Sequence, residues 1–153
     1  MSEAAPSIHA TAVVVGEIGV LLRGPSGAGK SAVALALIEL AASRRLFARL
    51  VADDRVILAS VGGRLLAAPH PALVGRIERR GAGVEAQPHL DRAVIGLVAD
   101  LAGPADRPAR LPEEAERRIA LGGVILPRIA TQGDPLTSAA AILACLRSLR
   151  RSR

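Results

Sequence analysis

The segment from Gly24 to Ser31 contains the residues that indicate chemistry most directly. It reads Gly-Pro-Ser-Gly-Ala-Gly-Lys-Ser and matches G-x-x-x-x-G-K-[ST], the pattern of a phosphate-binding P-loop. Lys30 is the single lysine among 20 basic residues, all the others being arginine. A compact ammonium on a flexible stem suits this position better than a planar guanidinium. The predicted phosphate-binding residues are therefore Gly24, Pro25, Ser26, Gly27, Ala28, Gly29, Lys30 and Ser31.

An acidic pair follows the apolar run Leu50-Val51-Ala52, which predicts a short buried strand ending at Asp53 and Asp54. A P-loop nucleotide site needs an acid at the end of a neighbouring strand to hold its metal ion. Two adjacent carboxylates raise each other's proton affinity unless a cation or a donor lies nearby. The pair therefore predicts one carboxylate near Mg²⁺ and one acting as general base, with a solvated turn as the alternative.

Two further groups of residues have less obvious roles. Residues 78–84 read Glu-Arg-Arg-Gly-Ala-Gly-Val. They are either an exposed turn or a loop that presents a carboxylate and a guanidinium to a phosphate–metal centre. His9 precedes the first predicted strand, and a lone histidine in that place is typical of an ordinary surface or core residue.

The elements that must position these residues follow from hydrophobic runs and turn residues. Residues 13–15 and 20–22 flank a glycine-containing turn and predict a hairpin whose second strand leads into the P-loop. Residues 30–43 contain strong helix formers and no Gly or Pro, which predicts a helix beginning inside the loop. A second hairpin is predicted at residues 56–59 and 64–67. The remaining predictions are a strand at 93–98, a loop at 103–114, helical turns within 113–120, a strand at 124–126 ended by Pro127, and a helix from Asp134 and Pro135 to about Arg150.

Composition limits the class of protein. The 153 residues predict one domain, and the single aromatic residue means that the core is built from Ala, Val, Leu and Ile. A net charge of +6 permits nucleic-acid binding, but the arginines are scattered and no aromatic platform is available, so we expect no nucleic-acid partner. No apolar run is long enough to span a bilayer and no secretory signal is recognisable, which predicts a cytoplasmic protein without membrane attachment.

Taken in their order along the chain, these residues resemble the catalytic domain of HPr kinase/phosphorylase, in a short form that consists of the C-terminal catalytic domain only. In that family a histidine lies 21 positions before the P-loop lysine, as His9 lies before Lys30. The family also has a Leu-Val-Ala-Asp-Asp run after the P-loop helix, as at residues 50–54. The resemblance covers about residues 8–85 well, and the family's signature loop matches Glu78, Arg80, Gly81, Gly83 and Val84.

The resemblance implies a fold and an activity. The fold is a single α/β P-loop domain over residues 1–153, with a mixed sheet around the P-loop helix as in the HPr kinase catalytic domain and phosphoenolpyruvate carboxykinase. The implied activity is ATP- and Mg²⁺-dependent phosphorylation of a serine on the phosphocarrier protein HPr of a sugar or nitrogen phosphotransferase system. The family also catalyses phosphorolytic dephosphorylation of phosphoserine-HPr. It is hexameric, which implies a homo-oligomer.

The resemblance implies roles for single residues as well. Lys30 and the loop amides would bind the ATP phosphates, Asp54 would be the general base, and His9 would support or orient the carboxylate pair. Arg117, in Glu116-Arg117, corresponds to a catalytic arginine of the family. The residues at the Mg²⁺ site would be Ser31, Asp53 and Glu78.

The chain departs from the family pattern beyond about residue 85. Only Leu126-Pro127-Arg128 resembles the later basic loop, which the family uses for the phosphorylase reaction. Two other functions stay open. One is a P-loop kinase for a small metabolite, with residues 103–118 as a lid, although the acidic pair and residues 78–83 argue against it. The other is a nucleotide-sensing regulatory domain without transfer activity.

Overall fold

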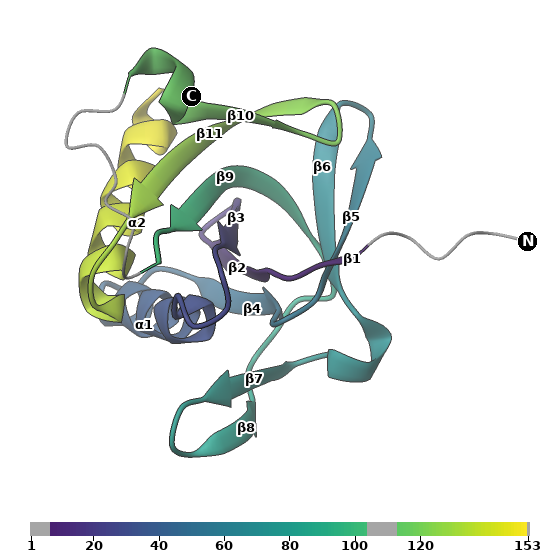
Figure 1. The fold of residues 1–153 in the computed structure, drawn as a ribbon, viewed down its shortest axis with the longest axis vertical. Helices are drawn as coiled ribbons and strands as arrows, with labels where there is room; N and C mark the ends of the chain where they lie inside the picture. Colours follow the sequence, from purple (N-terminus) through teal and green to yellow (C-terminus); the bar gives the residue numbers. More distant parts are fainter. Residues whose placement is uncertain (1–6, 104–112, 153) are drawn as a thin grey trace, which may run out of the picture.

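The computed structural model describes residues 7–103 and 113–152, and its main feature is a curled sheet of nine strands (Figure 1). The strand order is β1 (Ser7–Ile8), β5 (Val56–Val61), β6 (Arg64–Pro69), β9 (Ala93–Leu101), β3 (Ile18–Arg23), β2 (Thr11–Val15) and β4 (Ala48–Ala52). β11 (Val124–Thr131) also pairs with β9, and β10 (Arg118–Leu121) pairs with β11. The pairs β3–β9 and β9–β11 are parallel and the others antiparallel, which confirms the predicted mixed sheet.

Helices α1 (Lys30–Ser43) and α2 (Pro135–Arg151) pack on one face of the central strands. Because successive strand residues point to opposite faces, Val13 and Val15 face the helices while Ala12 and Val14 face the other way. That second face is covered by the strands that curl over it, β5, β6, β10 and β11 (Figure 1). The central strands are buried on both sides, which explains their nearly continuous apolar sequence.

Both predicted hairpins and both predicted helices are confirmed. α1 occupies the predicted residues and begins directly after Gly29. The side chain of Asp134 caps α2, accepting from the Thr137 N–H at 2.9 Å and from its hydroxyl at 2.8 Å. Pro135 follows at the first helical position, where its missing N–H has no cost. Within the described residues, no helix is long and apolar enough to cross a membrane.

The prediction that a strand ends at Pro127 is wrong, because β11 continues to Thr131. Pro127 lies where β11 changes partner: residues 124–127 pair with β10, and residues 128–131 pair with β9. A proline lacks the N–H that a continuous ladder needs, and this junction between two ladders tolerates it. The predicted helical turns at 113–120 are confirmed only for the 3₁₀ turn η2 (Glu114–Arg117), since β10 begins at Arg118. Most of the predicted loop at 103–114 lies outside the described residues.

A separate two-stranded hairpin, β7 (Arg76–Arg79) and β8 (Gly83–Ala86), projects from the main sheet (Figure 1). It follows the 3₁₀ turn η1 (Pro71–Leu73). Ile77 is 1% exposed and joins the core beneath α1. The residues from Glu78 to Val84, for which the sequence predicts either a turn or a functional loop, form the tip of this hairpin.

Candidate active site

A cleft of about 250 Å³ lies where the P-loop, the end of β4 and the β7–β8 hairpin meet. It brings together most of the residues that the sequence singled out. Thr11 and Ala32 also line it, and the sequence analysis did not predict either of them. The predicted residues that line it are Ser26, Gly27, Gly29, Lys30, Ser31, Asp53, Asp54, Glu78 and Arg80.

The strand order explains why segments far apart in sequence meet here. β2 lies between β3 and β4 and is antiparallel to both. The carboxyl ends of β3 and β4 and the amino end of β2 therefore share one edge of the sheet. The P-loop follows β3, Asp53 follows β4, and Thr11 begins β2.

The P-loop requires glycine for two different reasons, backbone conformation and space. Gly27 and Gly29 have φ angles of 83° and 89°, the left-handed region that costs a side chain about 1 kcal/mol or more. Gly24 is needed for space, since a Cβ there would lie 2.6 Å from the Leu101 carbonyl oxygen. Lys30 Nζ donates to the Gly24 and Pro25 carbonyl oxygens, at 2.8 and 3.3 Å. Its ammonium is thus held over the loop whose amides are the predicted phosphate donors.

Asp53 joins three elements through its carboxylate. Oδ1 accepts from the Thr11 hydroxyl at 2.8 Å and from the Ser31 hydroxyl at 2.7 Å, and Oδ2 accepts from the Glu78 backbone N–H at 3.2 Å. The residue is only 6% exposed. Hydrogen bonds to an ionised group are the strong ones, so this carboxylate is fixed in orientation. The one sequence signal for Thr11 is a hydroxyl at the start of an otherwise apolar strand.

Asp54 has the opposite environment, with a side chain 70% exposed. Its φ angle of 68° turns the chain sharply after Asp53, and aspartate is among the few residues enriched in that region. His9 Nδ1 lies 3.6 Å from Asp54 Oδ1, which makes an ion pair when the imidazole is protonated. The two neighbouring carboxylates are therefore separated by their surroundings, one anchored and one accessible.

Arg79 holds the β7–β8 hairpin to α1. Its Nη2 lies 2.9 Å from Glu85 Oε1 on the partner strand and 3.4 Å from Glu39 Oε1 on α1. The hydrogen bond from Arg79 lowers the pKa of Glu85, and the same bond raises the pKa of Arg79. Arg80, the next residue, is exposed at the rim of the cleft. Of the two adjacent arginines, one is structural and one faces the cleft.

A second ionic cluster joins the carboxyl ends of β3 and β9 to the middle of β11. Asp100 accepts from Arg23 Nε at 2.8 Å and from Arg128 Nε at 2.6 Å. Partial burial raises the pKa of Asp100, but the hydrogen bonds from Arg23 and Arg128 outweigh it, so its pKa lies below the usual value. Arg128 Nη1 also donates to the Glu116 carbonyl oxygen at 3.0 Å. Arg117, the predicted catalytic arginine, lies exposed in η2 and is not among the described residues that line the cleft.

The oxygen donors in the cleft are of the kind that Mg²⁺ binds. The described residues contain no group of three or more His, Cys, Asp or Glu arranged to hold a metal ion. Magnesium in kinase sites is instead held by one or two carboxylates together with substrate phosphates and water. A serine hydroxyl and two carboxylates, from Ser31, Asp53 and Glu78, are oxygen donors of that kind. These residues therefore fit the ion.

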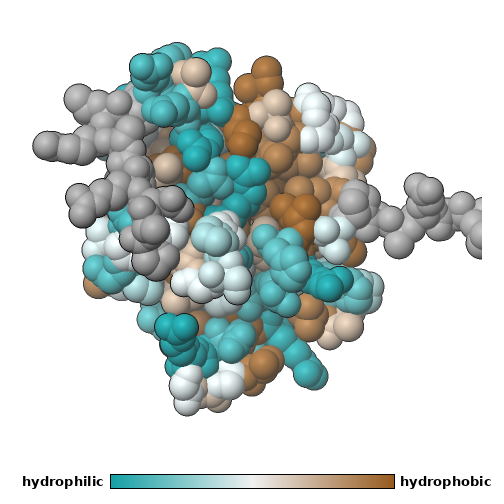
Figure 2. All heavy atoms as spheres, viewed as in Figure 1, coloured by the Kyte–Doolittle hydropathy of each residue, from teal (hydrophilic) through white to brown (hydrophobic). Residues whose placement is uncertain are grey.

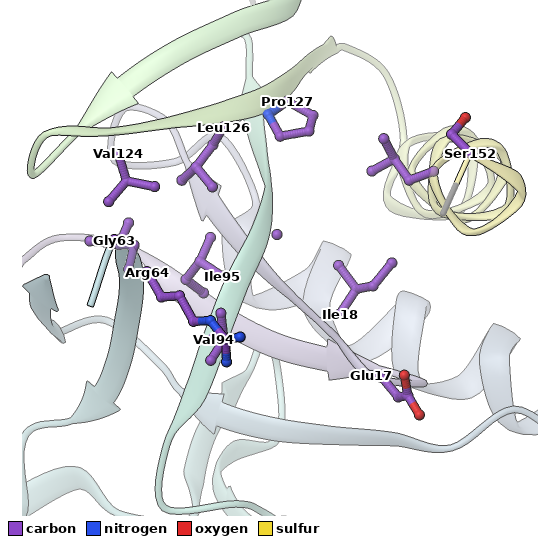
Figure 3. A pocket seen from close by; sticks show the side chains of 13 residues that line it. Glu17, Ile18, Gly63, Arg64, Val94, Ile95, Val124, Leu126, Pro127 and Ser152 are labelled. Carbon is purple, nitrogen blue, oxygen red and sulfur yellow. The ribbon is translucent and has the colours of Figure 1, made fainter. Parts of the chain in front are cut away.

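A larger cavity of about 710 Å³ lies at the other ends of β3 and β9 (Figure 3). Figure 3 shows Val124 and Leu126 of β11 on one side of this cavity and Ile95 of β9 on the other. β3 spans six residues, so the two ends are about 16 Å apart. Figure 2 shows hydrophobic side chains gathered over this side of the sheet. The described lining of this larger cavity includes none of the predicted site residues. The larger of the two cavities is therefore not the candidate active site.

The fold and the cleft define a P-loop α/β domain with an acidic pair beside the loop. The family model for the HPr serine kinase C-terminal domain matches residues 2–86, and the chain belongs to that family. It is 38% identical over 76 residues to an HPr kinase/phosphorylase of Mycoplasma mycoides, covering 50% of this chain and 22% of the relative. It is 39% identical over 101 residues to that of Clostridium tetani, covering 61% and 31%. The chain spans less than a third of the length of these relatives.

A solved structure supports the fold over nearly the whole chain. The HPr(Ser) kinase/phosphatase from Coxiella burnetii aligns with a TM-score of 0.76 and 24% identity. The alignment covers 97% of this chain and 99% of the other. The similarity therefore extends beyond the residues that match the family model, and at this identity it concerns the fold.

Proposed function

We propose that this chain is a kinase domain that transfers the γ-phosphoryl group of ATP to a serine hydroxyl of the phosphocarrier protein HPr. The observation that carries the proposal is the cleft itself. It combines the P-loop Lys30 and Ser31 with an anchored Asp53 and an exposed Asp54. A kinase that acts on a small metabolite can enclose its substrate and needs no carboxylate on an open surface. A serine on a folded protein can reach only a carboxylate that is accessible at the surface.

Each group has a definite task in the proposed transfer. The loop amides and Lys30 hold the phosphates of ATP. Ser31, Asp53 and Glu78 would hold Mg²⁺, which would neutralise phosphate charge when bound. Asp54 accepts the proton of the serine hydroxyl. The serine oxygen forms a bond to the γ-phosphorus while the bond to the ADP oxygen breaks. His9, 3.6 Å from Asp54, orients the carboxylate and supports it electrostatically.

The same carboxylate serves the reverse reaction that we propose as a second activity. An oxygen of inorganic phosphate forms a bond to the phosphorus of phosphoserine, and the bond to the serine oxygen breaks. Pyrophosphate leaves, and protonated Asp54 returns its proton to the serine oxygen. A carboxylate that accepts a proton in one direction returns it in the other, by microscopic reversibility.

Incubation with γ-labelled ATP, Mg²⁺ and purified HPr tests the proposal. We expect label on a serine of HPr, and none on HPr in which that serine is replaced by alanine. Binding of ATP without transfer would favour the nucleotide-sensing function. Label on a small molecule would favour the metabolite kinase. Release of pyrophosphate from phosphoserine-HPr and phosphate tests the reverse reaction.

We also propose that residues 1–153 act as one catalytic domain in the cytoplasm and assemble into a homo-oligomer. Two core clusters that share the central strands support the single domain. The family resemblance implies a hexamer. Light scattering after size-exclusion chromatography measures the mass directly, and a monomeric mass would overturn the oligomer.

A further inference from the structure

The cavity of about 710 Å³ at the far ends of β3 and β9 lies in a gap of the sheet (Figure 3). β6 pairs with β9 only at Ala93 and Val94, and β11 joins the same edge of β9 only from Val98 onward. On that edge, residues 95–97 of β9 therefore have no strand partner within the described parts of the chain. Residues of β6, β9 and β11 line the cavity, so it occupies the space between the departing and the arriving strand.

A β-bulge lies at this gap. Gly19 of β3 pairs with Ile95, and the next residue, Val20, pairs with Leu97, so Gly96 is an extra residue in β9. Residues two apart in a strand normally share a face, yet Ile95 and Leu97 belong to the core clusters on opposite faces of the sheet. Gly96 itself is half-buried and lines the cavity. Bulges are frequent beside functional sites, and this one gives the cavity a wall of backbone without a side chain.

The other walls of the cavity are held in place without a ligand. The Ser60 hydroxyl, near the tip of the β5–β6 hairpin, donates to the Gly122 carbonyl oxygen in the turn between β10 and β11. This hydrogen bond joins the two hairpins whose strands β6 and β11 line the cavity. The volume lies within the range of roughly 300–1,000 Å³ that is usual for small-molecule sites, which are mostly preformed.

The lining combines apolar side chains with an arginine. Ile95, Leu126 and Leu149, from three different elements, are among the apolar residues that line the cavity. Arg64, at the start of β6, also lines it and is exposed. Among the described residues, no carboxylate lies within 4.0 Å of the Arg64 guanidinium. The cavity therefore offers an apolar surface beside a cation that has no ionic partner in the described parts of the chain.

The charges around the cavity favour an anion over a cation. Glu17 is the one acidic residue in the described lining, and a second arginine lies near it. A Cβ on Gly16 would lie 3.9 Å from Arg150 Nη1, which places that guanidinium beside the turn that carries Glu17. Two arginines and one glutamate therefore give this region a net positive charge, and arginine forms charge-assisted hydrogen bonds with carboxylates.

We propose that this cavity is a binding site for a small amphipathic anion. The apolar body of the ligand packs against Ile95 and Leu126, and its carboxylate lies on Arg64. The site is separate from the proposed phosphate cleft, which lies at the opposite ends of β3 and β9, and it does not depend on the proposed function.

NMR titration of the ¹⁵N-labelled chain with octanoate and with 1-octanol tests the proposal, because the two probes share an apolar body and differ in charge. We expect saturable binding of both, with shifts of amide signals concentrated at residues 17–18, 64–65, 94–96 and 124–126. Arg64→Gln should weaken octanoate by about fivefold, the upper end for an exposed ion pair, and octanol by less than about twofold. Arg64→Lys keeps the charge and should stay within about twofold of the wild type for both probes. Arg76→Gln, the same change at an exposed arginine on β7, is the matched control.

A second variant tests the cavity without changing its charge. Val94 lines the cavity and is 38% exposed, so a larger side chain can be placed there without disturbing the core. Val94→Phe narrows the cavity and should weaken both probes by about tenfold or more. Val61→Phe, the same change at an exposed residue outside the described lining, should leave both affinities unchanged.

Each outcome bears on the proposal. Selective loss of octanoate with Arg64→Gln, together with loss of both probes with Val94→Phe, supports it. Equal effects of Arg64→Gln on the two probes would overturn the assignment of an anion. Absence of saturable binding, or signal shifts at other residues, would overturn the site. If neither probe binds and light scattering gives Val94→Phe a smaller mass than the wild type, the cavity is covered by a second copy of the chain and the small ligand is ruled out.

Discussion

Asp53 and Asp54 are neighbours in sequence, yet their surroundings give them different chemistry. Asp53 accepts three hydrogen bonds from three elements, whereas Asp54 is exposed in a left-handed turn. A carboxylate whose oxygen atoms are held in place by hydrogen-bond donors suits a metal ion. An accessible carboxylate suits proton transfer from a protein substrate. In the proposed function the two roles follow from local structure, although the residue type is the same.

Replacement of Lys30 by alanine tests the phosphate site. A hydrogen bond to a charged group contributes about 1.5–3 kcal/mol, so Lys30→Ala should weaken MgATP binding by about 10- to 100-fold. Lys30→Arg keeps the charge but replaces the point donor with a planar fork, and it should not restore affinity. Calorimetry with MgATP gives the measurement. Unchanged affinity and unchanged kinase activity in Lys30→Ala would remove the P-loop argument.

We expect Thr11 to be a positioning residue, because its hydroxyl holds the Asp53 carboxylate. Thr11→Val keeps the shape but removes one of the two hydroxyl donors to the buried Asp53 Oδ1, at a cost of about 1–2 kcal/mol in unfolding free energy. We also expect the Mg²⁺ concentration needed for half-maximal transfer to rise. Thr11→Ser keeps the hydroxyl and should restore the Mg²⁺ dependence. Loss of stability with an unchanged Mg²⁺ dependence would make the role of Thr11 purely structural.

At the scale of elements, the β7–β8 hairpin presents Glu78 and Arg80 to the cleft and is tied to α1 through Arg79. The Arg79–Glu39 pair is exposed, and such pairs contribute little to stability. We therefore expect this ion pair to fix the position of the hairpin and to add little to the free energy of unfolding. The backbone hydrogen bond from the Glu78 N–H to Asp53 and the buried side chain of Ile77 also connect the hairpin to the rest of the domain.

Arg79→Ala should loosen the hairpin more than it destabilises the protein. We expect faster hydrogen exchange across residues 76–86 and a transfer rate lower by roughly fivefold or more. The change in unfolding free energy should stay below about 1 kcal/mol. Arg76→Ala, an exposed arginine on the same strand, is the control and should leave both readouts unchanged. Wild-type exchange in Arg79→Ala would show that the hairpin does not depend on this pair.

The elements that could be predicted from the sequence are those with local signals. The two β-hairpins and α1 have turn glycines or an uninterrupted run of helix formers, and α2 has a capping aspartate followed by proline. β11 was underestimated because its second half is held by parallel pairing with β9, about thirty residues earlier in the chain. No local sequence pattern indicates such a pairing, and Pro127 is a residue that normally ends a strand.

At the scale of the whole molecule, the Arg23–Asp100–Arg128 cluster joins β3, β9 and β11 at the edge that carries the P-loop. Arg23 directly precedes Gly24, and Leu101 limits the space around Gly24. The cluster therefore connects the P-loop to β11. Because the folded pKa of Asp100 is depressed, its carboxylate contributes stability above its unfolded pKa, and this contribution is lost as the pH falls through the folded pKa.

Asp100→Asn should therefore destabilise the protein in a pH-dependent way. At pH 7 we expect a loss of about 1–2 kcal/mol in unfolding free energy, since the group is only partly buried. Below about pH 3.9, the usual pKa of aspartate, the difference from the wild type should shrink toward zero. Urea denaturation at pH 7 and pH 3 provides the comparison. An equal difference at both values would mean that the charge of Asp100 contributes nothing.

The site was more predictable than the sheet that holds it, because its motifs are contiguous in sequence. The P-loop, the acidic pair and the signature loop could each be read locally and placed in order by their resemblance to a family. Thr11 was missed because its role depends on the register of β2 against β4. Arg117 lies in η2, outside the lining of the cleft, and its catalytic role stays a prediction.

The central claim, that Asp54 is the base of a serine phosphotransfer centre, is tested most directly by Asp54→Asn. Two quantities are measured on the same protein: MgATP affinity, and single-turnover transfer of label to HPr. A general base contributes about 10²–10⁴-fold, so we predict at least a 100-fold loss of transfer with ATP affinity within about threefold of the wild type. Transfer at the wild-type rate with Asn at position 54 would contradict the account.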